Sequence, residues 1–143
     1  MIPSDYQTPQ EPQPRIQELN EQQCWELLEQ ARFARLGTLD EGQIDITPLN
    51  IVAAGQRIYF RTAKGHKLTQ LTLNPNVALE VDRAEGGTAV SVLVRGEARQ
   101  LIEPEEIEYV ESLALNPWLN TEKLEIIEIT PTRVTGRRFR LGQ

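Results

Sequence analysis

Short apolar segments separated by tight turns are the feature that most constrains the fold of this chain. The segment 33–39 alternates apolar and polar residues, and Asp40-Glu41-Gly42 follows it as a turn. A second turn, Ala54-Gly55-Gln56, precedes the apolar segment 57–62. Connections this short join antiparallel strands, because a parallel crossover needs about a dozen residues or more. The sequence therefore predicts a meander of β-hairpins.

The remaining pattern predicts a few short helices and further strands. We expect helices at 19–31, 68–73 and 104–115, and strands at 43–52, 77–82, 89–101, 124–129 and 133–140. Pro48 has no N–H to donate, so it predicts a sheet edge or a bulge. Gly96 predicts a bulge or a close backbone approach, and Pro131 an interruption of the last strand. Antiparallel strands with few helices suggest a mainly β domain closed into a barrel.

Composition limits the domain organisation and the class of partner. The chain has 143 residues, enough for one domain with its own core. Residues 1–17 hold four prolines among Gln, Ser, Thr and Glu, which predicts a flexible arm before a single domain at 18–143. No apolar run approaches the roughly 20 residues that span a bilayer. The net charge of -6 argues against bulk nucleic-acid binding, and a cytoplasmic location is expected.

Cysteine and histidine are too scarce for several kinds of site. The single cysteine, Cys24, excludes an internal disulfide, and its place on the apolar face of the first predicted helix indicates a core residue. The acidic stretch 103–111 contains no His, so we read it as a solvated helix face and expect no metal site.

The stretch 61–67 is the strongest candidate for a binding site. It links a predicted strand to a predicted helix start, where free backbone N–H groups and the helix dipole favour an anion. Its cationic and hydrogen-bonding side chains are Arg61, Thr62, Lys64, His66 and Lys67. No Asp or Glu occurs between Asp45 and Glu80. This pattern predicts a cradle for a phosphate, and a solvated basic turn is the alternative.

The order of these segments resembles a known family. The segments 33–39, 46–49, 58–68 and 73–78 follow one another as in the pyridoxamine 5′-phosphate oxidase-like superfamily of FMN-binding split barrels. The motif Lys64-Gly65-His66-Lys67 is similar to that of small flavin-binding proteins that include the nitroimidazole-resistance proteins. Asn116-Pro117-Trp118 and the segment 135–138 resemble the ends of several members. The resemblance covers about 19–139 and implies an antiparallel split β-barrel of the FMN-binding type.

The resemblance also implies a homodimer with FMN sites at the subunit interface. It assigns the phosphate to Arg61, Lys64 and Lys67, with added hydrogen bonds from Thr62 and His66. It places the stretch Thr47, Pro48, Leu49 and Asn50 along the isoalloxazine ring. Trp118 would lie near the ring or else fill the dimer core, and Arg137 or Arg138 would reach the same region.

The activity implied by the resemblance is an FMN-dependent oxidoreductase acting on a small acceptor. The catalytic residues stay unassigned, because no side chain is an evident acid, base or nucleophile. The alternatives are a non-catalytic flavin carrier or sensor, a deazaflavin-dependent reductase, and a dimeric module without ligand. Further basic and aromatic residues typical of the true oxidases are not evident, which argues against oxidation of pyridoxamine phosphate. With His66 as the sole His, haem held by two imidazoles is not expected.

Overall fold

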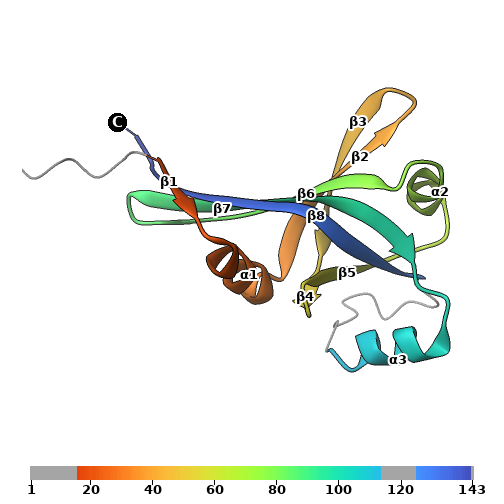
Figure 1. Ribbon diagram of the computed structural model, residues 1–143. Helices are drawn as coiled ribbons and strands as arrows, with labels where there is room; N and C mark the ends of the chain where they lie inside the picture. Colours follow the sequence, from red (N-terminus) through yellow and green to blue (C-terminus); the bar gives the residue numbers. More distant parts are fainter. Residues whose placement is uncertain (1–15, 114–124, 143) are drawn as a thin grey trace, which may run out of the picture.

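A single antiparallel sheet with short helices forms the described part of the chain (Figure 1). The computed structural model describes residues 16–113 and 125–142. The elements are β1 (Ile16–Leu19), α1 (Glu21–Gln30), β2 (Phe33–Asp40), β3 (Gln43–Asn50), β4 (Val52–Ala54), β5 (Arg57–Thr62), α2 (His66–Leu73), β6 (Asn76–Glu85), β7 (Thr88–Gln100), α3 (Pro104–Glu111) and β8 (Glu125–Arg140). The strand order is β3-β2-β6-β7-β8-β5-β4, with β1 added to β8.

The sheet curves without closing. Its outermost strands, β3 and β4, follow each other in the chain, yet neither pairs with the other in the described strand order. Ile51 lies between β3 and β4 in the chain, and its amide donates to the Arg32 carbonyl at 3.1 Å. The closed barrel suggested by the strand pattern is therefore wrong, and the split barrel implied by the resemblance is confirmed.

Local turn chemistry explains the hairpins that the sequence predicts. Glu41 and Gly42 have φ values of 48° and 81°, and Gly55 and Gln56 have 58° and 59°. Positive φ at both central residues gives the turn whose twist matches a β-hairpin. Pro48 lies on β3, which is an edge strand as predicted.

Two predicted breaks in the sheet do not exist. The segment 83–88 separates the strands predicted at 77–82 and 89–101, but it mostly continues β6 and β7, which pair up to Glu85 and Thr88. Pro131 lies inside a continuous β8, where the register shifts opposite Gly96. A Cβ on Gly96 would lie 2.4 Å from the Thr130 carbonyl oxygen, so the close approach predicted there is confirmed. This irregularity tolerates a residue without an N–H.

One face of the sheet is packed and the other is open. Leu36, Leu79 and Val94 lie side by side on the inner face and are fully buried. Helix α1 covers this face and contributes Cys24, which is a core residue as predicted. The alternate residues, such as Arg35, face outward, where no helix appears in Figure 1.

The ends of α1 and α3 differ slightly from the prediction. Asn20 caps α1 in a capping box, since its Oδ1 accepts from the Gln23 amide at 2.8 Å and Gln23 Oε1 accepts from the Asn20 amide at 2.9 Å. Ile16 and Gln17, assigned by the sequence to the flexible arm, form the first half of β1 instead. They pair with β8, which the sequence pattern does not reveal. The rest of the predicted arm lies outside the described residues. The helix predicted to run to 115 ends at Glu111, and Ser112 is its C-cap.

Helix α3 packs against the sheet through a second apolar cluster of Tyr59, Leu101, Val110 and Ile126. Arg99 of β7 adds ion pairs with Glu106 at 2.6 Å and Glu128 at 2.9 Å.

In the described residues, no helix is long and apolar enough to cross a lipid bilayer.

Candidate functional site

The N-terminus of α2 presents backbone donors at the end of β5. The first hydrogen bond of the helix runs from the Thr69 amide to the Gly65 carbonyl at 3.0 Å, so the amides of residues 66–68 have no partner within the helix. Gly65 precedes the helix with φ 154°, a conformation that L side chains rarely adopt, and it offers no capping side chain. Of the three helices that the structure describes, α2 alone has no acidic residue in its first turn.

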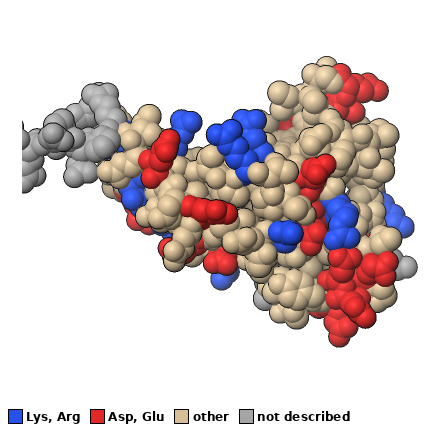
Figure 2. All heavy atoms as spheres, viewed as in Figure 1, with Lys and Arg blue, Asp and Glu red and all other residues tan. Residues whose placement is uncertain are grey.

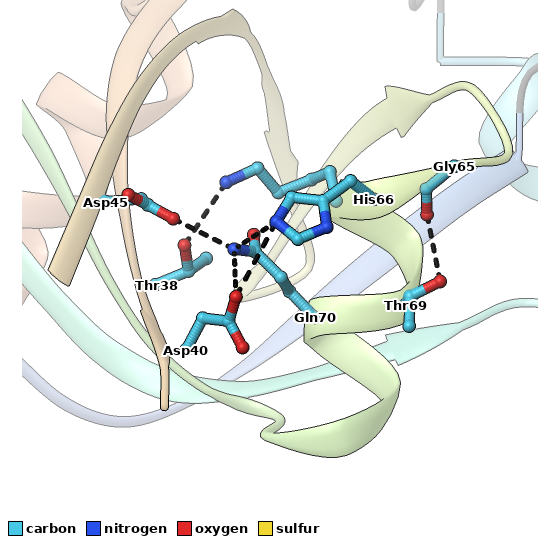
Figure 3. A network of polar contacts seen from close by, with 8 residues as sticks. Thr38, Asp40, Asp45, Gly65, His66, Thr69 and Gln70 are labelled. Atoms are coloured by element: carbon cyan, nitrogen blue, oxygen red, sulfur yellow. Dashed lines mark hydrogen bonds and ion pairs between the residues drawn. The ribbon is translucent and has the colours of Figure 1, made fainter. Parts of the chain in front are cut away.

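A network of polar side chains joins this end of α2 to the β2–β3 hairpin (Figure 3). Lys67 Nζ donates to Thr38 Oγ1 at 3.2 Å. Gln70 Nε2 donates to Asp45 Oδ2 at 2.9 Å and to Asp40 Oδ2 at 3.2 Å. His66 Nε2 lies 3.1 Å from the same amide nitrogen and 3.6 Å from Asp40 Oδ2.

The other predicted cradle residues take no part in this network among the described residues. Arg61 alternates with Phe60, which is in the main core, and shares a side with Tyr59, which packs edge-on against Tyr109 of α3. The Nε atom of Arg61 is buried and has no hydrogen-bond partner among the described residues. Lys64 is largely exposed and lies 3.9 Å from Glu125 Oε1. Thr62 Oγ1 makes only a long contact of 3.4 Å to the Ala63 carbonyl in the described part of the chain.

The stretch between Asp45 and Glu80 contains no acidic residue, but acidic side chains from other segments lie close to it in the fold. Asp40 and Asp45 reach α2 from the β2–β3 hairpin, and Glu125 reaches Lys64 from β8. The site therefore combines cationic and anionic side chains. The carboxylates restrain His66, Lys64 and Gln70, whereas no carboxylate of the described residues forms a hydrogen bond or ion pair with Arg61 or Lys67.

The stretch expected beside the ring lies on the edge strand β3. Thr47 and Leu49 pair with the inward-facing Leu36 and Ala34, whereas Pro48 and Asn50 pair with the outward-facing Arg35 and Phe33. Thr47, Leu49 and Asn50 are half-buried and Pro48 is exposed. Lys67 contacts Thr38, which pairs with Asp45 only two residues before Thr47. The strand and the N-terminus of α2 thus adjoin the same hairpin.

The described chain does not bring Arg137 or Arg138 to this site. Arg138 is exposed on β8, where it pairs with Gln17 of β1 and Val90 of β7. Figure 1 shows β1 at the opposite end of the sheet from α2. Arg137 is its neighbour on the same strand. Trp118 lies outside the described residues.

The open face of the sheet carries charges of both signs. Arg35 Nη1 binds Glu80 at 2.9 Å and Asp82 at 2.6 Å, and Ser91 donates to Glu80 at 3.1 Å. Burial raises the pKa of Glu80, and its neighbour Asp82 raises it further. The shared hydrogen bond with Glu80 lowers the pKa of Asp82. Figure 2 shows acidic side chains gathered over α3 and both signs along the sheet.

A groove of about 850 Å³ runs along this open face. It is lined by residues of β1, β6, β7 and β8, among them Ile16, Leu93, Arg137 and Phe139. It does not include the end of α2. Within the described residues, no group of His, Cys, Asp and Glu could hold a metal ion.

Sequence reasoning missed Thr38, Asp40, Asp45 and Gln70. Gln70 is the residue that a pattern search could have found, because a polar side chain one helical turn after His66 lies on the same helix face. The carboxylates belong to a distant hairpin, and only the fold brings them to α2.

This chain resembles one protein family and several solved structures. The sequence matches the family described as pyridoxamine 5′-phosphate oxidase over residues 20–138. A Corynebacterium glutamicum protein named for that oxidase is 34% identical, with 93% of this chain and 100% of that chain covered and a TM-score of 0.81. The FAD-binding protein of Mycobacterium smegmatis is also 34% identical, with 88% and 100% covered and a TM-score of 0.79. A Bacteroides thetaiotaomicron protein named for 5-nitroimidazole resistance shares the fold at 16% identity, with 87% and 89% covered and a TM-score of 0.75.

Proposed function

Because the chain belongs to the pyridoxamine 5′-phosphate oxidase family, we propose that it binds FMN, with the phosphate at the N-terminus of α2. The observation that carries this proposal is a helix start with free amides, no acidic first turn and Lys67 beside it. Such a helix start attracts a phosphate through both its N–H groups and its dipole.

The side chains around the turn fit a phosphate. Arg61 has a buried Nε–H without a described partner, which is a donor that an anion would satisfy. Lys67 is a half-buried cation whose described partner is a neutral hydroxyl. Exposed His66 and Lys64 add hydrogen bonds from the turn, and Thr62 adds a hydroxyl. The ring lies along Thr47–Asn50, where backbone groups of an edge strand are free to pair.

FAD is the second candidate cofactor, favoured by the name of the M. smegmatis protein. Both flavins present a phosphate, so the same helix end serves either one. A deazaflavin is a third ligand with comparable polar groups.

The bound flavin supplies the hydride or electron transfer, and the protein supplies binding and orientation. We therefore propose a flavin-dependent oxidoreductase that reduces or oxidises a small molecule. A flavin carrier or sensor is the alternative, since no described side chain near α2 stands out as an acid or base for a substrate.

We further propose that two copies associate through the open face of the sheet. A face with Glu80 and Asp82 near Arg137 carries both charge signs, so it can be complementary to itself across a two-fold axis. Exposed Ile44 and Ile46, at 75% and 69%, extend this face onto β3. A second copy would cover apolar area that a monomer leaves in water. Arg137, which lies opposite Ser91 on the open face, and Trp118 would then complete the site across the interface, whereas Arg138 pairs with Val90 on the other face.

Titration of the ligand-free protein with FMN, FAD, riboflavin, a deazaflavin and haem tests the proposal. We expect saturable binding of a phosphorylated flavin, detected by flavin fluorescence and by calorimetry. Absence of binding to every flavin would refute it. Bleaching of the bound flavin by NAD(P)H, followed by reoxidation with an added acceptor, separates an enzyme from a carrier.

A further inference from the structure

The tip of the β2–β3 hairpin has little support from the rest of the sheet. Strand β2 pairs with β6 only from Arg35 to Thr38, so the hairpin beyond Thr38 extends past the neighbouring strand. Its apolar side chains Leu39 and Ile44 are exposed rather than packed. Figure 1 shows this hairpin projecting from the sheet beside α2.

The contacts that hold the tip come from α2. Among the described residues, every side-chain hydrogen bond or ion pair between α2 and another helix or strand ends on this hairpin. Gln70 makes two of them, and its side chain is only 2% exposed. Its amide bridges carboxylates on both strands, Asp40 at the end of β2 and Asp45 near the start of β3.

The orientation of the Gln70 amide is dictated by these carboxylates. Of the three groups near the amide nitrogen, the two carboxylates can accept its two N–H groups, whereas the reversed amide would direct its oxygen at both anions. In the observed orientation, Oε1 is buried without a hydrogen-bond partner among the described residues. An unsatisfied buried acceptor is unfavourable, so the two charged hydrogen bonds outweigh it.

We infer that Gln70 is a positioning residue that holds the β2–β3 hairpin against the first turns of α2. This inference rests on the proposed function: the hairpin carries the strand assigned to the flavin ring, and α2 carries the end assigned to the phosphate. Gln70 therefore sets the separation between the two halves of the site. It does so from the buried side of α2, next to His66, without itself contacting the phosphate.

We call the contact of the Gln70 amide with Asp40 and Asp45 the latch. Hydrogen exchange of the flavin-free protein tests the latch independently of any ligand. We compare Gln70→Met, which keeps the length but cannot donate, with Thr72→Ala and Ile129→Val. Among the described residues, Thr72 bonds only within its own helix, to the Leu68 carbonyl, and Ile129 is a core residue of β8, which does not pair with the hairpin. We expect Gln70→Met to speed exchange about tenfold in 38–46 and 65–73 alone. Unchanged exchange, or a uniform increase like that of Ile129→Val, would overturn the inference.

Flavin binding supplies the second readout. Riboflavin lacks the phosphate, so it depends less on the spacing between hairpin and helix than FMN does. The ratio of FMN to riboflavin affinity should fall about fivefold in Gln70→Met and stay unchanged in both controls. An unchanged ratio would contradict the positioning role. A wild-type protein that binds no flavin would refute the proposed function, and the exchange experiment would still decide whether the latch exists.

A variant at the protein surface keeps the inference testable if Gln70→Met fails to fold. Asp45 is exposed on β3, so Asp45→Ala removes one acceptor of the latch without touching the core. It should reproduce part of the local exchange of Gln70→Met, because the bond from Gln70 to Asp40 stays. The double variant should exceed Gln70→Met by little, because Gln70→Met already removes the contact with Asp45. Full additivity of the two effects would show that Gln70 and Asp45 act separately and would overturn the inference.

Discussion

At the scale of single residues, the candidate site differs from its sequence pattern in which groups are free. Lys64 and His66 lie near carboxylates, whereas Arg61 retains a buried donor without a described partner and Lys67 contacts a hydroxyl. An anion binds most favourably to cationic groups without an internal ion pair, since no free energy is spent on breaking one. Arg61 and Lys67 are therefore the side chains that should matter most for phosphate binding.

Replacing both residues tests this ranking. Arg61→Ala combined with Lys67→Ala should weaken FMN binding by at least about tenfold, because each lost charged hydrogen bond is worth roughly 1.5–3 kcal/mol. Riboflavin binding should change much less. Calorimetric titration measures both affinities. The matched control removes two exposed cations that do not line the groove of the open face, Arg32→Ala with Arg133→Ala, and should leave FMN binding intact. Equal losses in the two pairs would point to overall charge instead of a phosphate site.

Tyr59 makes a prediction about pH. Burial, with a smaller contribution from Glu128, raises the pKa of Tyr59 from 10.0 to about 12. The folded protein therefore keeps Tyr59 neutral at a pH where the unfolded chain ionises it. This contribution to stability is fully present below pH 10 and is lost as the pH rises from about 10 to about 12. Thermal unfolding between pH 8 and 12 should show a smaller fall in Tm above pH 10 for Tyr59→Phe than for wild type. Parallel curves would contradict this account.

At the scale of elements, the register shift in the long strand pair β7–β8 leaves room only for a glycine on β7. Gly96 meets the register shift beside Pro131, where a Cβ would approach the Thr130 carbonyl oxygen at 2.4 Å. Backbone atoms on a paired strand cannot move aside as a flexible side chain can. The glycine thus lets β8 stay continuous through a proline.

Gly96→Ala should therefore lower the free energy of unfolding by about 1–3 kcal/mol through overpacking. Chemical denaturation at neutral pH measures the change. Gly87→Ala is the matched control, because nothing lies within 4 Å of a Cβ there and its φ is not positive. The idea would fail if the two alanine variants were equally stable.

At the scale of the whole molecule, the sheet is a half-barrel with one covered and one open face. Helix α1 and the main core occupy the inner side, whereas Leu93 lies half-buried in the groove of the open side between Glu80 and Thr135. We assign the open face to a second copy, which would also bring residues from the far end of the sheet toward the partner's α2.

A charge at the centre of the open face tests that assignment. Wild-type protein should sediment as a dimer, and Leu93→Lys should shift it toward monomer at micromolar concentration, because the new ammonium group would lose its water on association. Ile102→Lys places the same charge at a residue that is 68% exposed and does not line the groove. It should remain dimeric. A monomeric wild type would exclude the shared site, and a dimeric Leu93→Lys variant would move the interface elsewhere.

The features that the sequence determined by itself are those fixed within a few residues. The positive-φ turns, the capping box at Asn20, the edge position of Pro48 and the close approach at Gly96 follow from steric limits and local hydrogen bonds. The strand, turn and helix around 61–67 follow in the same way, and so does the resemblance that led to the family.

Only the tertiary structure decided what surrounds those features. Pro131 stays within a strand because Gly96, distant in sequence, lies opposite it. The N-terminus of α2 meets Asp40 and Asp45 because the β2–β3 hairpin folds back beside it, so a basic stretch without acids became a mixed site. The sequence gives the chemical type of each side chain, but the electrostatic environment of a group depends on every chain segment within a few ångströms. That environment exists only once the sheet has formed.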